Sequence, residues 1–234
     1  MKLHVENLSK RYGDTVVLKD ISYTFESGKI YGLLGRNGAG KTTFFNCLNQ
    51  DILCNGGSAF LESESGRDLL NPKDIGYVLS TPVVPEFLTG REFLKFFLDI
   101  HKDKNHKSLD EYFDLVQLSQ ADQNKLLRDY SHGMKSKMQL LIHIISNPKV
   151  ILLDEPLTSL DIVVQDEMKK LLKELKNDHI IIFSTHILEI ALDLCDEIIV
   201  LNNCSLETVE KKNLNTKKYK EKIIKMLKEE KSND

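Results

Sequence analysis

The stretch Gly35–Thr42, which reads GRNGAGKT, constrains the fold of this chain more than any other feature. It matches the pattern G-x-x-x-x-G-K-[ST] at every fixed position, a match expected by chance in under about 1% of chains of this length. The apolar run Ile30–Leu34 precedes it and predicts a buried strand, and a helix is expected from about Lys41. An ordinary glycine-rich turn would not require the Lys-Thr pair. The sequence therefore predicts a phosphate-binding loop between a buried strand and a helix.

The residue types of this loop suit the binding of a nucleoside triphosphate. Its glycines let backbone N–H groups close around a phosphate, and the start of the following helix adds a partial positive charge. Lys41 supplies a point charge for the β- and γ-phosphates, the Thr42 hydroxyl can bind Mg²⁺, and Thr43 can reach the α-phosphate. The residues predicted to contact the nucleotide here are Gly35, Arg36, Asn37, Gly38, Ala39, Gly40, Lys41, Thr42 and Thr43.

Ionisable side chains follow two further apolar strands. Val150–Leu153 is followed by Asp154 and Glu155, and a later strand is followed by His186. We expect Asp154 to hold Mg²⁺ through a water, opposite Thr42, and Glu155 to polarise a water for in-line attack. His186 should lie at the same sheet edge, within reach of the γ-phosphate. Exposed acids at strand ends and a histidine at a helix start are common, but their combination with the phosphate loop favours a catalytic site.

The order of the predicted elements indicates an α/β fold with a P-loop NTPase core. Apolar strands alternate with helices, which is typical of a doubly wound sheet that binds ligands at the carboxyl ends of its strands. Alternating apolar residues before the loop predict an antiparallel β subdomain. Residues 83–130 show a helical pattern, with capping-box spacing from Thr89 and from Ser108, and predict an inserted α-helical lobe. We expect the ATP-binding domain, with this lobe inside it, to span residues 1–205.

A lysine-rich segment follows that domain. Between residues 210 and 234 there are nine lysines and five acids. Four apolar residues of this segment fall on one helical stripe, namely Tyr219, Ile223, Met226 and Leu227. The pattern predicts an amphipathic C-terminal tail over residues 206–234 that covers the core with its apolar stripe. Contact of the lysine face with anionic lipid or with a partner is the alternative.

Composition argues against several classes of function. The net charge is −3, so no overall positive field favours nucleic acid, and no nucleic-acid partner is expected. No apolar stretch approaches the roughly 18 residues that span a bilayer, and no signal peptide is predicted, so a role at a membrane would require a partner. The four cysteines lack C-x-x-C spacing and are expected to be reduced, cytosolic thiols.

The segment Tyr130–Met134, which reads YSHGM, predicts a second anion site. Ser131 is a natural helix N-cap, and Gly133 leaves backbone amides open at a helix start. This segment, the phosphate loop, ILLDEP at 151–156, SLD at 159–161 and STH at 184–186 follow one another in an order that resembles the nucleotide-binding subunits of ABC transporters, exporters in particular. The resemblance covers roughly residues 1–205.

The resemblance implies an ATPase that uses ATP and Mg²⁺ and works as a dimer. Two subunits would sandwich two ATP molecules, each held by the phosphate loop of one subunit and by Ser131 and Gly133 of the other. Tyr12 resembles the residue that stacks on adenine, Asp161 the aspartate that crosses the dimer, and His186 the γ-phosphate switch. Hydrolysis would power export through a separate transmembrane permease, with the ATPase in the cytoplasm on the inner face of the membrane. Whether the second ATPase is a copy or a different chain stays open.

A few positions depart from the family pattern. Ser80 stands where the family has a glutamine that contacts Mg²⁺ and water, and serine cannot offer the same reach. In the signature, usually LSGGQ, Tyr130, His132 and Met134 replace the leucine, one glycine and the glutamine. Cys204 stands where a turn glycine is usual, which we interpret as structural.

Other functions are compatible with parts of the pattern. A soluble ATPase acting on DNA or ribosomes usually carries two ATPase halves or a long coiled-coil insert, and this sequence has neither. A nucleotide-binding regulatory subunit with little turnover is suggested by Ser80. A small-molecule kinase of the P-loop class would leave the YSHGM segment and Asp161 without a purpose.

Overall fold

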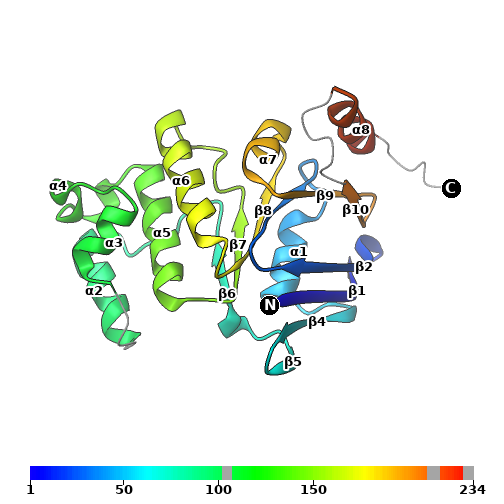
Figure 1. The fold of residues 1–234 in the computed structure, drawn as a ribbon, viewed down its shortest axis with the longest axis horizontal. Helices are drawn as coiled ribbons and strands as arrows, with labels where there is room; N and C mark the ends of the chain where they lie inside the picture. Colours follow the sequence, from blue (N-terminus) through cyan, green and yellow to red (C-terminus); the bar gives the residue numbers. More distant parts are fainter. Residues whose placement is uncertain (102–106, 210–216, 229–234) are drawn as a thin grey trace.

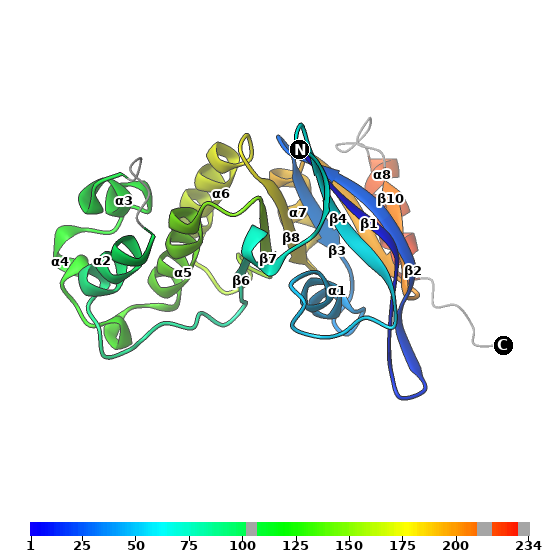
Figure 2. The same cartoon turned by 90° about the horizontal axis from the view of Figure 1, so that it is seen from below.

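The computed structural model describes residues 1–101, 107–209 and 217–228. Its strands form two sheets, and helices cover both faces of the larger one (Figures 1 and 2). The mixed α/β fold predicted from the alternation of apolar strands and helices is confirmed. Among the described residues, every helix is too short or too polar to span a bilayer.

The larger sheet has the strand order β10-β9-β3-β8-β7-β6, in which only β10 is antiparallel to its neighbour. Every residue of β3, β7 and β8 is buried, as expected for central parallel strands that are covered on both faces. Because β8 pairs with both β3 and β7, the carboxyl ends of these three strands lie side by side. The strands are β3 (Ile30–Leu34), β6 (Ile75–Val78), β7 (Val150–Asp154), β8 (Ile180–Thr185), β9 (Glu197–Asn202) and β10 (Ser205–Val209).

The smaller sheet is antiparallel, in the order β2-β1-β4-β5. Together with helix α1 it packs on one face of the larger sheet, and Phe44 and Phe45 of α1 belong to that apolar core. On the opposite face, α5, α6 and α7 form a second core (Figure 2). The elements are β1 (Lys2–Tyr12), β2 (Thr15–Glu26), β4 (Gly56–Ser63), β5 (Gly66–Leu69), α1 (Lys41–Leu48), α5 (His132–Ser146), α6 (Ile162–Leu175) and α7 (Leu188–Leu194).

Short helices lie beyond α5 at one end of the molecule (Figure 1). They are α2 (Gly90–Ile100), α3 (Leu109–Leu115), α4 (Gln120–Gln123) and the 3₁₀ turn η2 (Leu127–Asp129), while a further 3₁₀ turn, η1 (Pro72–Asp74), precedes β6. Both predicted capping boxes are present, one at Thr89 with Glu92 and one at Ser108 with Glu111. In each box the serine or threonine and the glutamate satisfy backbone N–H groups at the helix start, which fixes where the helix begins.

Tyr130 connects this group of helices to the start of α5. Its hydroxyl donates a hydrogen bond to the Asp122 carbonyl oxygen at 2.8 Å, and burial raises the pKa of Tyr130 to about 12. A Cβ atom at Gly90 would lie 2.1 Å from the Tyr130 hydroxyl oxygen. The larger phenol, in place of the family's usual leucine, therefore fits because residue 90 is a glycine.

The end of the chain adds a strand and a helix to the core. Strand β10 runs across the boundary expected between residues 205 and 206, because Ser205–Val209 pairs with β9 along its full length. Helix α8 (Lys217–Lys228) packs through Ile223, which is fully buried in the same core as α7. The rest of the predicted tail, at 210–216 and 229–234, and the side chain of Tyr219 lie outside the described residues.

His143 on α5 predicts a pH dependence of stability. Desolvation by burial lowers the pKa of His143 to about 4, with an opposing hydrogen bond to the Tyr77 main chain. An unfolded histidine titrates near pH 6.5, so the unfolded chain binds the proton first and stability falls as the pH drops from 6.5 towards 4. We expect the unfolding free energy to fall by about 2 kcal/mol more in the wild type than in His143→Gln between pH 7.5 and 5.

Urea unfolding of both proteins at the two pH values measures this difference. Because glutamine does not titrate, the variant reports the pH dependence of all the other groups. If the two proteins lost equal stability over this interval, His143 would not be a source of the pH dependence.

Candidate active site

The loop between β3 and α1 has the backbone conformation that its glycines permit. Gly40 directly precedes α1 with a φ of 102°, in the left-handed region that side chains disfavour. A Cβ at Gly40 would lie 2.8 Å from Val17 Cγ1, and one at Gly35 would lie 2.9 Å from the Leu201 carbonyl oxygen. The loop therefore has room only for backbone at these two positions.

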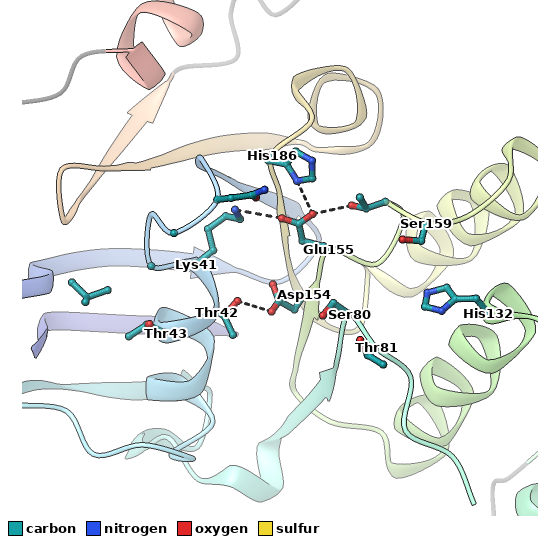
Figure 3. Close-up of a pocket in the computed structure, with 15 residues that line it drawn as sticks. Lys41, Thr42, Thr43, Ser80, Thr81, His132, Asp154, Glu155, Ser159 and His186 are labelled. Carbon is teal, nitrogen blue, oxygen red and sulfur yellow. Dashed lines mark hydrogen bonds and ion pairs between the residues drawn. The ribbon is translucent and has the colours of Figure 1, made fainter. Parts of the chain in front are cut away.

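Lys41, the first residue of α1, has a buried side chain at the centre of the site. Its side chain is 6% exposed, and Nζ donates to the carbonyl oxygens of Gly35 at 2.9 Å and Arg36 at 3.2 Å. Nζ also lies 3.4 Å from Glu155 Oε1 (Figure 3). The ammonium group is thus held directly above the loop, where it can contact a phosphate bound by the loop's N–H groups.

Thr42 and Asp154 meet as the sequence predicts. The Thr42 hydroxyl donates to Asp154 Oδ2 at 2.8 Å (Figure 3). The Ser184 hydroxyl donates to Asp154 Oδ1 at 2.5 Å. Asp154 is the last residue of β7 and is buried. Both oxygens of this carboxylate are therefore oriented by hydroxyl groups, one from the neighbouring strand β8 and one from α1.

Glu155 lies one residue past β7 and turns towards the opposite side of the site. Its backbone φ is 49°, which is uncommon for a residue with a side chain, and its N–H donates to Ser184 Oγ at 3.0 Å. Glu155 Oε2 lies 2.7 Å from His186 Nδ1 and accepts from the Thr158 hydroxyl at 3.0 Å. A strained backbone held by several contacts is frequent at functional sites. The carboxylate is consequently fixed between Lys41 and His186.

These side chains line a cavity of about 600 Å³. Ser80 and Thr81, which follow β6, lie on its wall, and His132 at the start of α5 is also a lining residue (Figure 3). Sequence reasoning did not select Val17, Thr81, Thr158, Ser159 or Ser184. Thr158 stands between two recognised motifs, and Ser159 and Ser184 each begin one, so their position in the chain was the available signal.

Several predicted site residues are not among those that line this cavity. Ser131 is exposed and caps α5, where its hydroxyl accepts from the Met134 N–H at 3.2 Å. Gly133 is buried against Val164 of α6. Asp161 caps α6 by accepting from the N–H groups of Val163 and Val164, at 3.0 and 3.1 Å.

Tyr12, at the end of β1, also lies apart from this lining and is 49% exposed. Its ring is partly covered by Lys10, whose Nζ lies 4.9 Å from the ring centroid. The backbone of Gly35, Arg36 and Ala39 belongs to the loop but is not part of the cavity wall. The structure thus brings Lys41, Thr42, Asp154, Glu155 and His186 together. Of the signature residues, His132 lines the same cavity, whereas Ser131 and Gly133 do not.

The residues present fit both Mg²⁺ and a triphosphate. No cluster of three or more His, Cys, Asp or Glu side chains suited to a metal occurs in the described part of the chain. One threonine hydroxyl beside one carboxylate is nevertheless the donor set that Mg²⁺ needs, because this ion takes oxygen ligands and keeps waters and substrate phosphates around it. The glycine positions that exclude a Cβ and the buried Lys41 ammonium suit the phosphates.

This geometry places the chain among the P-loop nucleoside triphosphatases. Comparison with known proteins narrows the class, because the family model described as ABC transporter matches residues 18–158. The chain belongs to the ABC transporter family and contains its ATP-hydrolysing, ATP-binding cassette, as the resemblance implied.

The chain is also similar to individual proteins whose names describe ATP-binding proteins of transport systems. The ABC transporter ATP-binding protein YdbJ of Bacillus subtilis is 34% identical over 206 residues, which cover 85% of this chain and 66% of YdbJ. The ABC transporter ATP-binding protein MJ1023 of Methanocaldococcus jannaschii is 35% identical, with 86% of this chain and 74% of that protein covered. The bacitracin transport ATP-binding protein BcrA of Enterococcus faecalis is 31% identical, with 86% and 66% covered. The chain thus spans about two thirds to three quarters of the length of these relatives.

Solved structures support the fold. An ATP-binding subunit of an ABC transporter is 26% identical and superposes with a TM-score of 0.74, covering 89% of this chain and 90% of the other. The dimeric ATP-binding cassette MJ0796, bound to ADP and phosphate, is 21% identical with a TM-score of 0.74, covering 89% of this chain and 99% of the other. The P-loop NTPase core predicted from the sequence is confirmed by these likenesses.

Proposed function

We propose that this chain binds and hydrolyses MgATP, pairs with a second cassette around two nucleotides, and powers export through a separate membrane permease. The observation that carries the proposal is the position of Glu155, held between Lys41 and His186 at the edge of the phosphate cavity. A carboxylate there can accept a proton from a water that attacks the γ-phosphate in line.

Each residue of the cavity has a role in this proposal. Lys41 and the loop N–H groups bind the β- and γ-phosphates, and Thr43 contacts the α-phosphate. Thr42 and, through a water, Asp154 hold Mg²⁺, which when bound neutralises negative charge on the phosphates. His186 donates to the γ-phosphate and orients Glu155. Tyr12 stacks on the adenine ring.

The pairing with a second cassette is supported by the separation of the two predicted anion sites. Ser131 does not line the cavity that holds Lys41 and is exposed, so the start of α5 is available to a nucleotide bound by another subunit. Next to Asp161, Ile162 and Val163 are 84% and 67% exposed, which is unusual for large apolar side chains. An apolar surface of this kind is typical of a protein interface.

The permease contact is proposed for the surface between β6 and α2. Val83 and Phe87 are 68% and 78% exposed there. An apolar surface on this segment suits a helix from a membrane partner, which would place the cassette on the cytoplasmic face of the membrane. The name of the relative BcrA, a bacitracin transport ATP-binding protein, supports a role in transport.

Affinity purification of the tagged chain from solubilised membranes tests the permease proposal. We expect an integral membrane protein with several spans to co-purify, and Val83→Asp with Phe87→Asp to release it without loss of ATPase activity. Recovery of the wild-type chain free of any membrane protein, together with association with nucleic acid or ribosomes, would support the soluble-ATPase alternative instead.

Ser80 supports a second candidate, a regulatory subunit with slow turnover. Ser80 lines the cavity, but its short side chain has no hydrogen bond to the other site residues in the described part of the chain.

If the lack of a glutamine amide at position 80 limits hydrolysis, Ser80→Gln should raise kcat by about tenfold, the effect of one regained hydrogen bond in the transition state. Ser80→Asn is the matched control, because its amide is shorter by one methylene. Steady-state ATPase assays that gave equal rates for all three proteins would remove Ser80 as a cause of slow turnover.

A further inference from the structure

A second cavity, of about 420 Å³, lies on the antiparallel subdomain. It is formed by β1, β2 and the turn between β9 and β10, and none of its lining residues lines the phosphate cavity. Val16, which is 47% exposed, and the buried Leu18 are its large apolar residues. Its volume lies in the range of small-molecule sites, which are mostly apolar with a few polar groups.

The cavity is also lined by an excess of positive charge. Lys10, Arg11 and Lys19 line it, and none of these forms an ion pair with any residue that the structure describes. Lys10 Nζ donates to the Leu53 carbonyl oxygen at 2.7 Å, so its partner is neutral. The adjacent acid, Asp20, accepts from the Ser9 hydroxyl at 3.1 Å. Cations beside an apolar surface favour an anion, because the low dielectric strengthens the attraction.

The turn that closes the cavity has an uncommon backbone. Asn203 and Cys204 have φ angles of 47° and 62°, although neither is a glycine, and this conformation costs roughly 1 kcal/mol or more for each. The turn is held against β2 by two contacts. Lys19 N–H donates to the Cys204 carbonyl oxygen at 2.7 Å, and Cys204 Sγ donates to the Val16 carbonyl oxygen at 3.0 Å. The side chains of both turn residues therefore become part of the cavity wall, which a glycine would not supply.

We propose that this cavity binds a small amphipathic anion, a carboxylate with an apolar chain. The apolar chain of the anion covers Val16 and Leu18, and its carboxylate pairs with the lining cations Lys10, Arg11 and Lys19. A fully hydrophilic anion would leave the apolar surface uncovered, and a neutral apolar ligand would leave the cations without a charged partner. The two cavities share no lining residue, so we expect the anion and ATP to bind at the same time.

Calorimetric titration of the full chain with octanoate tests the site. We expect one octanoate per chain, with acetate and octanamide binding at least about tenfold more weakly, since each lacks one of the two contacts. Saturating MgATP should leave the octanoate affinity unchanged. Equal binding of acetate, displacement of octanoate by ATP, or absence of octanoate binding would each overturn the proposal.

Paired variants locate the bound anion. Arg11→Glu with Lys19→Glu should weaken octanoate binding by about tenfold or more for each lost contact. The matched control, Lys95→Glu with Lys173→Glu, makes the same charge change at exposed sites elsewhere and should bind like the wild type. Val16→Asp should also abolish binding. Undiminished affinity in the Arg11 and Lys19 double variant would show that octanoate binds at another place.

Discussion

Glu155→Gln should lower kcat for ATP hydrolysis by about 10²–10⁴-fold while leaving ATP affinity within a few-fold of the wild type. Glutamine has the shape of glutamate and can still accept from the Thr158 hydroxyl, but it cannot take a proton from the attacking water. It also removes the negative charge 3.4 Å from Lys41 Nζ, which leaves the ammonium free to pair with phosphate. Binding and chemistry should therefore separate in this variant.

Steady-state turnover and equilibrium ATP binding, measured on the same preparation, give this comparison. Glu189→Gln is the matched control, because it makes the same change at an exposed position of α7 and should leave both quantities unaltered. The blocked variant should also accumulate as an ATP-bound dimer, visible as a doubling of mass at saturating MgATP. Full turnover in Glu155→Gln would remove Glu155 as the general base.

Lys41→Ala should weaken ATP binding by about 10²-fold or more. Hydrogen bonds to charged groups contribute roughly 1.5–3 kcal/mol each, and Lys41 can make one to the β- and one to the γ-phosphate. In the structure its ammonium group already lies over the loop, bonded to the Gly35 and Arg36 carbonyl oxygens. The charge is therefore preorganised for a triphosphate.

Calorimetric titrations with ATP and with AMP separate this effect from a general disturbance of the fold. AMP lacks both phosphates that Lys41 is expected to contact, so its affinity should be the same in Lys41→Ala and the wild type. An equal loss of affinity for ATP and AMP would instead indicate that the loop itself is damaged.

Much of this architecture could be predicted from residues next to one another in the chain. The phosphate loop is local, and Ile30–Leu34 and Lys41 place it between a strand and a helix. Asp154, Glu155 and His186 could be assigned to the same sheet edge because each follows an all-apolar strand, and parallel strands bring such positions together. The capping boxes at Thr89 and Ser108 gave two helix starts directly.

Other features depend on contacts between distant residues and could not be predicted. The Ser184 hydroxyl orients Asp154 across two strands, and the left-handed backbone of Glu155 follows from that packing. The fit of Tyr130 depends on Gly90, forty residues earlier. The boundary expected between residues 205 and 206 falls inside β10. This strand, Ser205–Val209, lacks a strong apolar pattern in the sequence and is specified by its pairing with β9. Cys204 was interpreted as structural, but only the folded turn shows that it lines a cavity.

The central claim is that each ATP site is shared between two cassettes, and mixing two inactive variants tests it most directly. Lys41→Ala damages the phosphate loop and leaves the signature intact. Ser131→Asp keeps an N-cap oxygen for α5 but, in the proposed dimer, would place a negative charge against the partner's nucleotide. Each variant alone should be nearly inactive. An equimolar mixture forms mixed dimers in which one site combines the undamaged loop with the undamaged signature, so about a quarter of the wild-type ATPase activity should return. A mixture no more active than the mean of the two variants would contradict the shared site.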